Sequence, residues 1–323
     1  MTECSFTRRS ILGMFGATAL VPLQATARPL GGVYGQAFGT DWGIIGPEQT
    51  DLTALRPDIM ALFEGFDRGF SPWRADSEIS RLNGEKAGTH VASAEMTIVS
   101  KAALEIAEAS HGAFDPTVGP LVAHWGFGPI KGGLIPDWRG LSVNANTIGK
   151  THDDLTLDLC GIAKGRALDL AAINIVNTRL ENALIDLGGE LTAIGQHPSG
   201  RAWQVAVEHP LSGDASVAVL ALPDGRSVAT SGVREHSYAL NGQTWAHIID
   251  PVTRQPVIGD LRSVTVVDDT AMMADGWATA LFAAGDTNGP TLASKMEIDA
   301  LFLFERDGNL HQHHTGDFQK MMV

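Results

Sequence analysis

The stretch Leu157–Gly165, with the sequence LDLCGIAKG, most constrains what this chain can fold into. Its apolar start predicts a strand, and apolar residues then recur from Leu168 to Val176 at the spacing of one helical face. A glycine turn before a helix start lets backbone N–H groups approach a ligand, and Lys164 adds a positive charge. The stretch therefore predicts an anion site suited to a phosphate. The alternative is an ordinary turn before a helix, with Lys164 solvated.

The net charge indicates that any such site is local. The chain has 23 Lys and Arg residues against 37 Asp and Glu residues, which is a formal net charge of −14. This balance argues against a general surface for nucleic acids or anionic membranes. With 323 residues, of which 44% are hydrophobic, the chain is long enough to bury a sizeable core.

Residues 1–27 have the pattern of an export signal. Arg8 and Arg9 precede an apolar run that ends at Val21, and residues 25–27 (ATA) form a small-x-small cleavage site. The paired arginines predict the twin-arginine route, and hence a periplasmic protein whose functional domain is residues 28–323. A membrane anchor is the alternative, but the apolar run is short for a bilayer.

The rest of the chain predicts a single compact α+β unit with a mainly antiparallel sheet and packed helices. Helical spacing occurs at residues 55–66, 101–111, 272–284 and 291–296. Strand-like runs occur at residues 183–190, 202–208, 215–222, 226–231, 237–249, 262–268 and 300–304. Consecutive strands joined by short turns favour antiparallel pairing. Residues 131–150, rich in Gly, Pro and Asn, predict a surface connection.

The cysteines and the C-terminal histidines predict no site of their own. Removal of residues 1–27 leaves Cys160 as the only cysteine, which excludes an intrachain disulfide. We expect Cys160 to be a small buried turn residue rather than a reactive thiol. No Cys or carboxylate is spaced to complete a metal site with His311, His313 and His314, which predict a solvated tail.

Two other places carry side chains suited to chemistry. Asp275 and Thr279 are four residues apart on a predicted helix and so share a face, and their oxygens suit Mg²⁺. The alternative for Asp275 is a cap or dipole partner near a helix start. His247 lies in an apolar run that predicts a strand, where a hydrogen-bonded core histidine is the alternative to a functional one. The chain contains no Gly-x-x-x-x-Gly-Lys-Ser/Thr loop and no Gly-x-Ser-x-Gly elbow.

Several motifs occur together along most of the chain. They are Asp76–Asn83 (DSEISRLN), Gly112–Pro120 (GAFDPTVGP), Leu157–Gly165 with Asp169, Asp186–Glu190 (DLGGE), Thr230–Gly232 (TSG), His247–Pro251 (HIIDP) and Ala274–Thr279 (ADGWAT). In this order they resemble the ApbE family of FAD:protein FMN transferases. The resemblance implies an ApbE-like, T-fold-related fold. It also implies Mg²⁺-dependent transfer of FMN from FAD to a Thr or Ser hydroxyl of a partner flavoprotein, by phosphoester formation with release of AMP.

The resemblance also implies roles for individual residues. Asp275 and Thr279 would supply metal oxygens, joined by the main-chain carbonyl of Gly161, so that Asp275 takes part in catalysis through the metal. The residues implied around FAD are Ala113, Phe114, Asp115, Lys164 and His247, with Phe38 and Trp73 where the family has Met and Tyr beside the flavin. His247 is the candidate general base, because a neutral imidazole accepts a proton near pH 7.

Two alternatives stay open for the same residues. A Mg²⁺-dependent FAD pyrophosphatase would let water attack, giving FMN and AMP. A non-catalytic exported flavin carrier would donate FAD intact, although a carrier needs no metal at the pyrophosphate. The resemblance permits a membrane respiratory subunit as the acceptor, and no nucleic acid is expected as a partner.

Overall fold

The structure of the chain is a computed structural model, which describes residues 29–212, 215–234, 237–240 and 243–323. Side chains are described outside residues 235–245. The predicted signal peptide at residues 1–27 lies outside the described residues.

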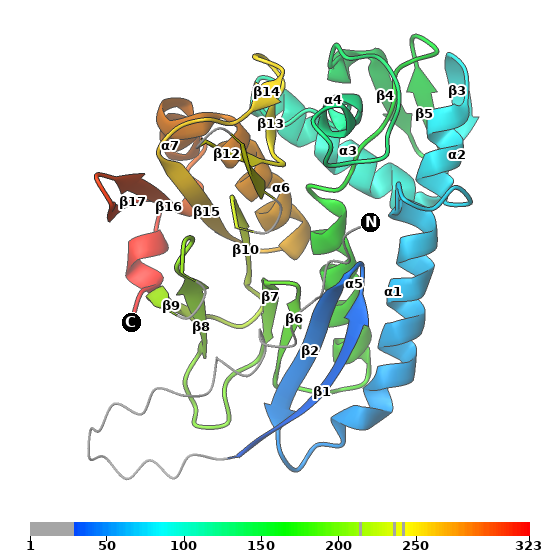
Figure 1. Cartoon of the computed structure of the whole chain (residues 1–323). Coiled ribbons are helices and arrows are strands. Elements are labelled where there is room, and N and C mark those ends of the chain that lie inside the picture. The colour runs from blue at the N-terminus through cyan, green and yellow to red at the C-terminus, as the bar shows by residue number, and fades with distance from the viewer. Residues whose placement is uncertain (1–28, 213–214, 235–236, 241–242) are drawn as a thin grey trace.

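A sheet of eight antiparallel strands forms the centre of the molecule (Figure 1). Its strands, in spatial order, are β1 (Leu30–Ala37), β2 (Thr40–Pro47), β6 (Ala183–Leu187), β7 (Glu190–Ile194), β10 (Ser227–Gly232), β15 (Leu261–Asp268), β16 (Asp299–Arg306) and β17 (Asn309–Thr315). The strands of this sheet follow one another in space in the same order as along the chain. Each connection is therefore either a short turn or a longer segment that leads to the neighbouring strand. The longest such segment, from β2 to β6, contains most of the helices.

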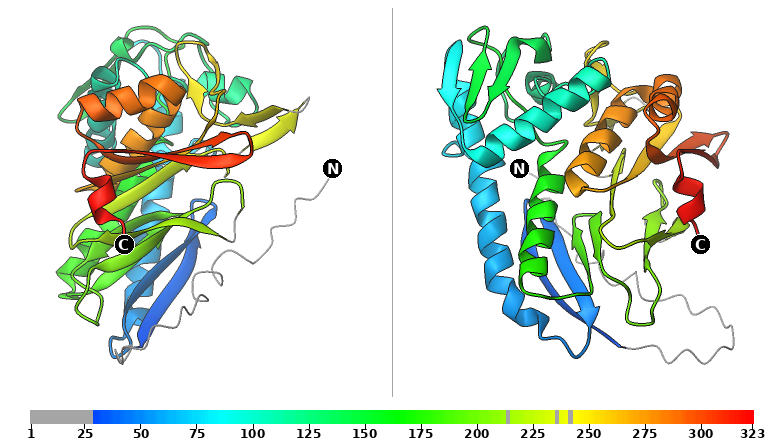
Figure 2. Two further views of the ribbon diagram at one scale, coloured as in Figure 1. Left: turned by 90° about the vertical axis from the view of Figure 1, so that its left-hand side faces the viewer. Right: turned by 180° about the vertical axis from the view of Figure 1, so that it is seen from behind.

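The two faces of this sheet bury two separate cores. Helices α1 (Arg56–Phe70), α5 (Ala163–Asn177) and α6 (Ala271–Ala283) cover one face, and the hairpin of β8 (Trp203–Glu208) and β9 (Ser216–Leu222) covers the other (Figure 2). Side chains alternate along a strand. Accordingly, Phe302 packs in the helical core, whereas Leu301 and Leu303 pack beneath the hairpin. Each such buried side chain stabilises the fold by about 1.5–3 kcal/mol.

The remaining elements are short and lie around this centre. The helices are α2 (Glu78–Gly84), α3 (Ala94–Ala109), α4 (Gly119–His124) and α7 (Gly285–Lys295), with 3₁₀ turns at η2 (Leu52–Leu55), η3 (Trp138–Gly140) and η4 (Phe318–Met321). The strands are β3 (Gly88–Val91), β4 (Leu141–Asn144) and β5 (Thr147–Lys150) in one small sheet, and the hairpins β11 (Ser237–Leu240) with β12 (Gln243–Ala246) and β13 (Ile249–Asp250) with β14 (Gln255–Pro256).

The predicted α+β architecture with a mainly antiparallel sheet is confirmed, and two local predictions are wrong. Residues 131–150 are not only a surface connection, because they contain η3, β4 and β5. Each strand there is four residues long, too short to show a hydrophobic period. The histidines of β17 are not on a free tail, although His311 and His313 are exposed to solvent as expected. That strand pairs with β16 along its whole length, and His314 is half-buried.

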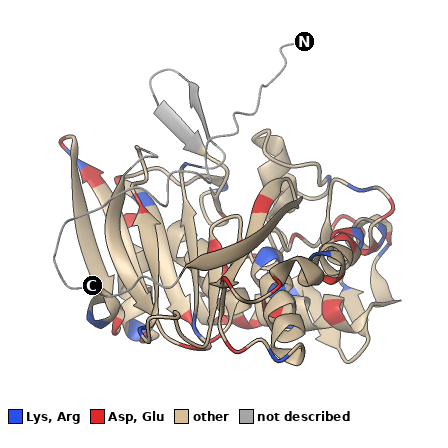
Figure 3. Ribbon diagram, turned by 90° about the horizontal axis from the view of Figure 1, so that it is seen from below, with Lys and Arg blue, Asp and Glu red and all other residues tan. Residues whose placement is uncertain are grey.

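Charged residues are distributed as the composition suggests. In the view of Figure 3, acidic and basic residues are interspersed along the described ribbon. Among the described helices, none combines the length and the apolar composition that a membrane crossing requires.

Candidate functional site

The segment Leu157–Leu159 is not part of a strand, which corrects the prediction from the sequence. The Asn83 side chain takes the place of a neighbouring strand. Its Nδ2 donates to the Leu157 carbonyl oxygen at 2.9 Å, and the Leu157 N–H donates to its Oδ1 at 2.7 Å. The next N–H, of Asp158, donates to the carbonyl of Pro116 at 2.7 Å. Helix α2 and the loop that follows α3, which are both distant along the chain, therefore hold this segment in place.

Helix α5 begins at Ala163, directly after the glycine turn, as predicted. Its N-cap, Ile162, provides no side-chain hydrogen bond, so the first N–H groups must find partners elsewhere. The N–H of Gly165 donates to Oδ2 of Asp275 on α6 at 3.0 Å. The start of α5 thus faces a buried carboxylate from a second helix.

Helix α6 brings its two predicted metal ligands to the glycine turn. Asp275 is buried, with 6% of its surface exposed, and Thr279 lies one turn further along. A Cβ atom on Gly161 would lie 2.9 Å from Thr279 Cγ2 and 3.1 Å from Thr279 Oγ1. The Gly161 backbone therefore contacts Thr279, and a side chain at position 161 would separate the two segments. Thr279 Oγ1 is also 3.1 Å from Ser231 Oγ on β10.

This donor set suits Mg²⁺ better than a transition metal. The described residues include no group of three or more His, Cys, Asp or Glu side chains able to hold a metal ion. What converges is one carboxylate, one hydroxyl and a glycine backbone, all of which offer oxygen. Mg²⁺ binds through one or two carboxylates and leaves much of its shell to water and to substrate phosphates. Gly161, Asp275 and Thr279 fit that pattern.

Lys164 is not merely solvated, as the alternative reading of its turn proposed. Its Nζ forms an ion pair with Oε2 of Glu190 at 2.8 Å, and the carboxylate side chain is only 5% exposed. Glu190 is the first residue of β7, after the turn that ends β6. Removing a charge from water is costly unless it is paired, so Lys164 stabilises Glu190, and Glu190 holds the lysine near the start of α5.

The loop with Ala113, Phe114 and Asp115 is packed against the same segment. Phe114 is buried, and its N–H donates to Ser110 Oγ at 3.0 Å. Asp115 is also buried, and its Oδ1 accepts from the N–H and the hydroxyl of Thr117 at 2.8 and 2.6 Å. Burial raises the pKa of Asp115, and the hydrogen bonds from Thr117 oppose that shift. Contact of these residues with FAD stays a prediction.

Three predicted flavin residues lie on other elements. Phe38 is in the β1–β2 turn at φ 52°, and its ring packs edge-on against Phe63 of α1 at 5.6 Å. Trp73, in the turn before α2, is 66% exposed. His247 is half-buried in the link between β12 and β13 rather than in a strand, with its ring centroid 6.4 Å from that of Phe127. Their contact with a flavin stays a prediction.

Cys160 is exposed, which corrects the expectation of a buried turn residue. Its N–H donates to Oδ1 of Asp158 at 3.0 Å. Desolvation by the surrounding protein, together with the carboxylates of Asp158 and Asp275, raises the pKa of its thiol well above the usual value. A thiol is nucleophilic as the thiolate, and Cys160 therefore has no activated character.

Sequence reasoning missed three residues that shape the site. Asn83, Glu190 and Ser231 were parts of motifs but received no role. Their partners are 74, 26 and 48 residues away along the chain, so no local spacing could reveal them. Only the occurrence of each within a shared motif was available as a signal.

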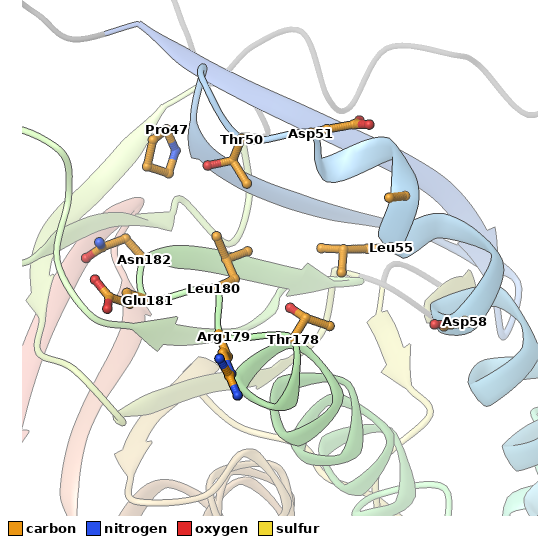
Figure 4. A pocket seen from close by; sticks show the side chains of 11 residues that line it. Pro47, Thr50, Asp51, Leu55, Asp58, Thr178, Arg179, Leu180, Glu181 and Asn182 are labelled. Atoms are coloured by element: carbon orange, nitrogen blue, oxygen red, sulfur yellow. The ribbon is translucent and has the colours of Figure 1, made fainter.

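A pocket of about 540 Å³ lies at the other end of α5 (Figure 4). Its lining comes from the β2–α1 connection and from residues 178–182, and it includes none of the predicted site residues. The labelled side chains of Asp51, Asp58 and Arg179 point away from one another. Because its charged groups do not converge, this pocket does not compete with the α5–α6 junction as the candidate site.

The chain is similar to known proteins over most of its length. Residues 38–302 match the model of the ApbE family. A Vibrio cholerae protein named FAD:protein FMN transferase is 32% identical over 305 residues, covering 89% of this chain and 91% of its own. A Klebsiella pneumoniae protein of the same name is 30% identical, covering 95% and 94%.

Solved structures resemble the fold over nearly the same span. The Flavin Transferase ApbE from Vibrio cholerae superposes with a TM-score of 0.81 at 30% identity, over 91% of this chain and 99% of that one. The Pseudomonas stutzeri flavinyl transferase ApbE, in its apo form, gives 0.82 at 27% identity, over 91% and 96%. The family model, the curated relatives and the solved structures agree, and the chain therefore belongs to the ApbE family.

Proposed function

We propose that this chain is a Mg²⁺-dependent FAD:protein FMN transferase, which moves FMN onto a Thr or Ser hydroxyl of a partner flavoprotein and releases AMP. The observation that carries the proposal is the convergence of Gly161, Asp275 and Thr279 at the start of α5, beside Lys164 and Glu190. The curated relatives bear the name of the same activity. The metal, the acceptor hydroxyl and the release of AMP go beyond those names: the oxygen donors of the site support the metal, and the resemblance of the motifs to the family implies the other two.

The site offers what cleavage of a diphosphate requires. The two linked phosphates of FAD carry negative charge that increases on the leaving group as the bond breaks. Mg²⁺, when bound, would supply charge neutralisation at those oxygens. Among the chain's own groups, the Lys164 ammonium lies at the start of α5 in its ion pair with Glu190, and the N-terminal end of the helix adds positive potential, part of which Asp275 already accepts. Catalysis then requires mainly alignment of the attacking hydroxyl and removal of its proton.

We assign removal of that proton to His247. It is half-buried and lies in a link between strands, and a neutral imidazole is a suitable base near pH 7. We expect His247→Asn to lower the rate of FMN transfer by about 10²–10⁴-fold and to leave FAD affinity nearly unchanged. FAD binding by fluorescence and transfer by intact mass measure the two effects separately. Unchanged transfer with unchanged FAD affinity would remove His247 from the mechanism.

The transferase is distinguished from its two alternatives in one incubation. The purified protein is mixed with FAD, Mg²⁺ and a candidate acceptor domain, and with the same domain carrying Ala at its target Thr or Ser. A transferase raises only the unsubstituted acceptor by the mass of one FMN and releases an equal amount of AMP. Free FMN and AMP without acceptor modification indicate the pyrophosphatase. FAD binding without AMP release indicates the carrier, and Asp275→Asn serves as the inactive control.

We further propose that the protein acts in the periplasm after twin-arginine export, with a flavoprotein outside the cytoplasm as acceptor, such as a membrane respiratory subunit. The support is the arrangement of Arg8 and Arg9 before the apolar run. Lys at both positions should retain the precursor in the cytoplasm, as judged by fractionation and N-terminal sequencing. Normal export of that variant would contradict the assignment.

A further inference from the structure

Helices α5 and α6 are joined by a reciprocal pair of contacts between their N-terminal turns. The start of α5 donates the Gly165 N–H to Asp275 of α6 at 3.0 Å. In return, Asp169 of α5 accepts hydrogen bonds from two N–H groups at the start of α6. Its Oδ1 accepts from Ala271 at 2.7 Å, and its Oδ2 accepts from Met272 at 3.1 Å.

Asp169 completes the capping of α6 from outside that helix. A helix leaves its first four N–H groups without intrahelical partners. Thr270, the N-cap of α6, provides its Oγ1 for Met273 at 3.2 Å and its carbonyl for Ala274 at 3.1 Å. Asp169 accepts hydrogen bonds from the two preceding N–H groups, those of Ala271 and Met272. Because both carboxylate oxygens are used, Asp169 constrains the orientation of α6 as well as its distance from α5.

The backbones of α5 and α6 are in close contact at the residues that Asp169 caps. A Cβ atom at Gly165 would lie 2.2 Å from the carbonyl oxygen of Ala271 and 2.8 Å from Met272 Cα. Backbone therefore touches backbone at the point that Asp169 caps. Asp275 follows Ala271 by one helical turn and Thr279 by two, so a shift or rotation at the start of α6 is transmitted directly to both side chains.

We infer that Asp169 is a positioning residue for the metal-binding face of α6, which holds Asp275 and Thr279 in register with the Gly161 backbone. This inference rests on the proposed Mg²⁺ site. Groups that hold metal ligands in place without binding the metal themselves typically weaken metal affinity by about 10–100-fold when they are removed. The same magnitude is expected here, because Asp169 acts on two ligands through one helix.

An ordinary helix cap would have a different signature, and the chain offers a matched control. Thr270→Ala removes a cap at the same end of α6 but leaves both contacts between the helices in place. Asp169→Asn keeps the size of the side chain, but its amide group can accept only one of the two N–H groups and its NH₂ opposes the other. Asp169→Ala removes both acceptors.

The test is calorimetric titration of Mg²⁺ into the metal-free, full-length mature protein. Melting temperature and FAD affinity in a chelator are measured for each variant. We expect Asp169→Asn and Asp169→Ala to weaken Mg²⁺ binding by about 10–100-fold, with FAD affinity in the chelator unchanged. Thr270→Ala should lower the melting temperature without weakening Mg²⁺ binding. If Asp169→Ala does not fold, Asp169→Asn carries the test by itself.

Three results would overturn the inference, and they differ in what else they affect. Mg²⁺ binding of wild-type strength in Asp169→Asn refutes the positioning role alone. Equal weakening in Thr270→Ala and Asp169→Asn also refutes it, because any loosening of the helix start would then suffice. Absence of Mg²⁺ binding in the wild type refutes the proposed metal site and this inference with it.

Discussion

Gly165 is the position where the structure makes its sharpest stability prediction. A methyl group there would lie 2.2 Å from the carbonyl oxygen and 2.6 Å from the carbonyl carbon of Ala271. These are backbone atoms of a neighbouring helix, which cannot rotate away as a flexible side chain would. Gly165→Ala therefore forces α5 and α6 apart at their N-terminal turns, and this stretches the hydrogen bond from Gly165 N–H to Asp275.

The magnitude follows from three contributions. Overpacking of a tight contact costs about 1–3 kcal/mol. Loss of a hydrogen bond to a buried carboxylate costs about 1.5–3 kcal/mol. Alanine in place of glycine in a helix returns up to about 1 kcal/mol. We therefore expect Gly165→Ala to lower the free energy of unfolding by about 1.5–5 kcal/mol.

Gly65, in the exposed part of α1, is the matched control. No heavy atom lies within 4 Å of a Cβ built there, so Gly65→Ala should raise the free energy of unfolding by about 0.5–1 kcal/mol. Both variants are measured by urea unfolding with linear extrapolation, and the m-values are compared to confirm the same transition. The two changes must have opposite signs. A Gly165→Ala protein as stable as the wild type would show that the helices are not in backbone contact.

Three further predictions concern buried polar groups. Burial raises the pKa of Asp169 from 3.8 to about 6, so the folded protein holds this proton more tightly than the unfolded chain does. That stabilisation is complete below the unfolded pKa and is lost as the pH rises through the folded one. Relative to Asp169→Asn, the wild type should lose about 3 kcal/mol of unfolding free energy between about pH 4 and pH 8. Asn83→Ala leaves the backbone groups of Leu157 without partners and should cost about 2–3 kcal/mol, measured by urea unfolding. Lys164→Met removes the ion pair of the deeply buried Glu190 carboxylate and should cost about 3–5 kcal/mol, whereas Glu190→Gln should cost less, because the lysine side chain is 24% exposed and can reach water.

Each of these has a result that would contradict it. For Asp169, a stability difference between wild type and Asp169→Asn that does not change with pH would mean that burial does not shift its pKa. For Asn83, replacement by Asp keeps the acceptor and removes the donor, so a loss as large as that of Asn83→Ala would show that only one of the two bonds matters. For the ion pair, equal losses in Lys164→Met and Glu190→Gln would show that the carboxylate is not the more deeply desolvated partner.

The sequence by itself determined the elements with strong local periodicity. Helix α5 begins directly after the glycine turn, and Asp275 and Thr279 share one face of α6, because residues four apart on a helix are neighbours wherever that helix lies. The run of strands after residue 200 predicted antiparallel pairing on another local ground, because short turns between consecutive strands favour antiparallel neighbours.

Some local structure was beyond the reach of the sequence. Strands β4 and β5 are too short to show an alternating pattern. Strand β17, with its histidines, owes its place to the apolar strand β16, which supplies the backbone hydrogen bonds. Leu157–Leu159 reads as a strand but takes its hydrogen bonds from Asn83 and Pro116 instead. In each case the deciding partner lies elsewhere in the chain.

Only the tertiary structure decided which distant groups make contact around the candidate site. The contacts between Gly165 and Asp275 and between Asp169 and Ala271 join residues 110 and 102 positions apart. Their existence depends on how closely two helices pack on one sheet, and that distance is set by the absence of a side chain at Gly165. Local spacing specifies which groups share a face. Packing between distant elements decides which faces meet.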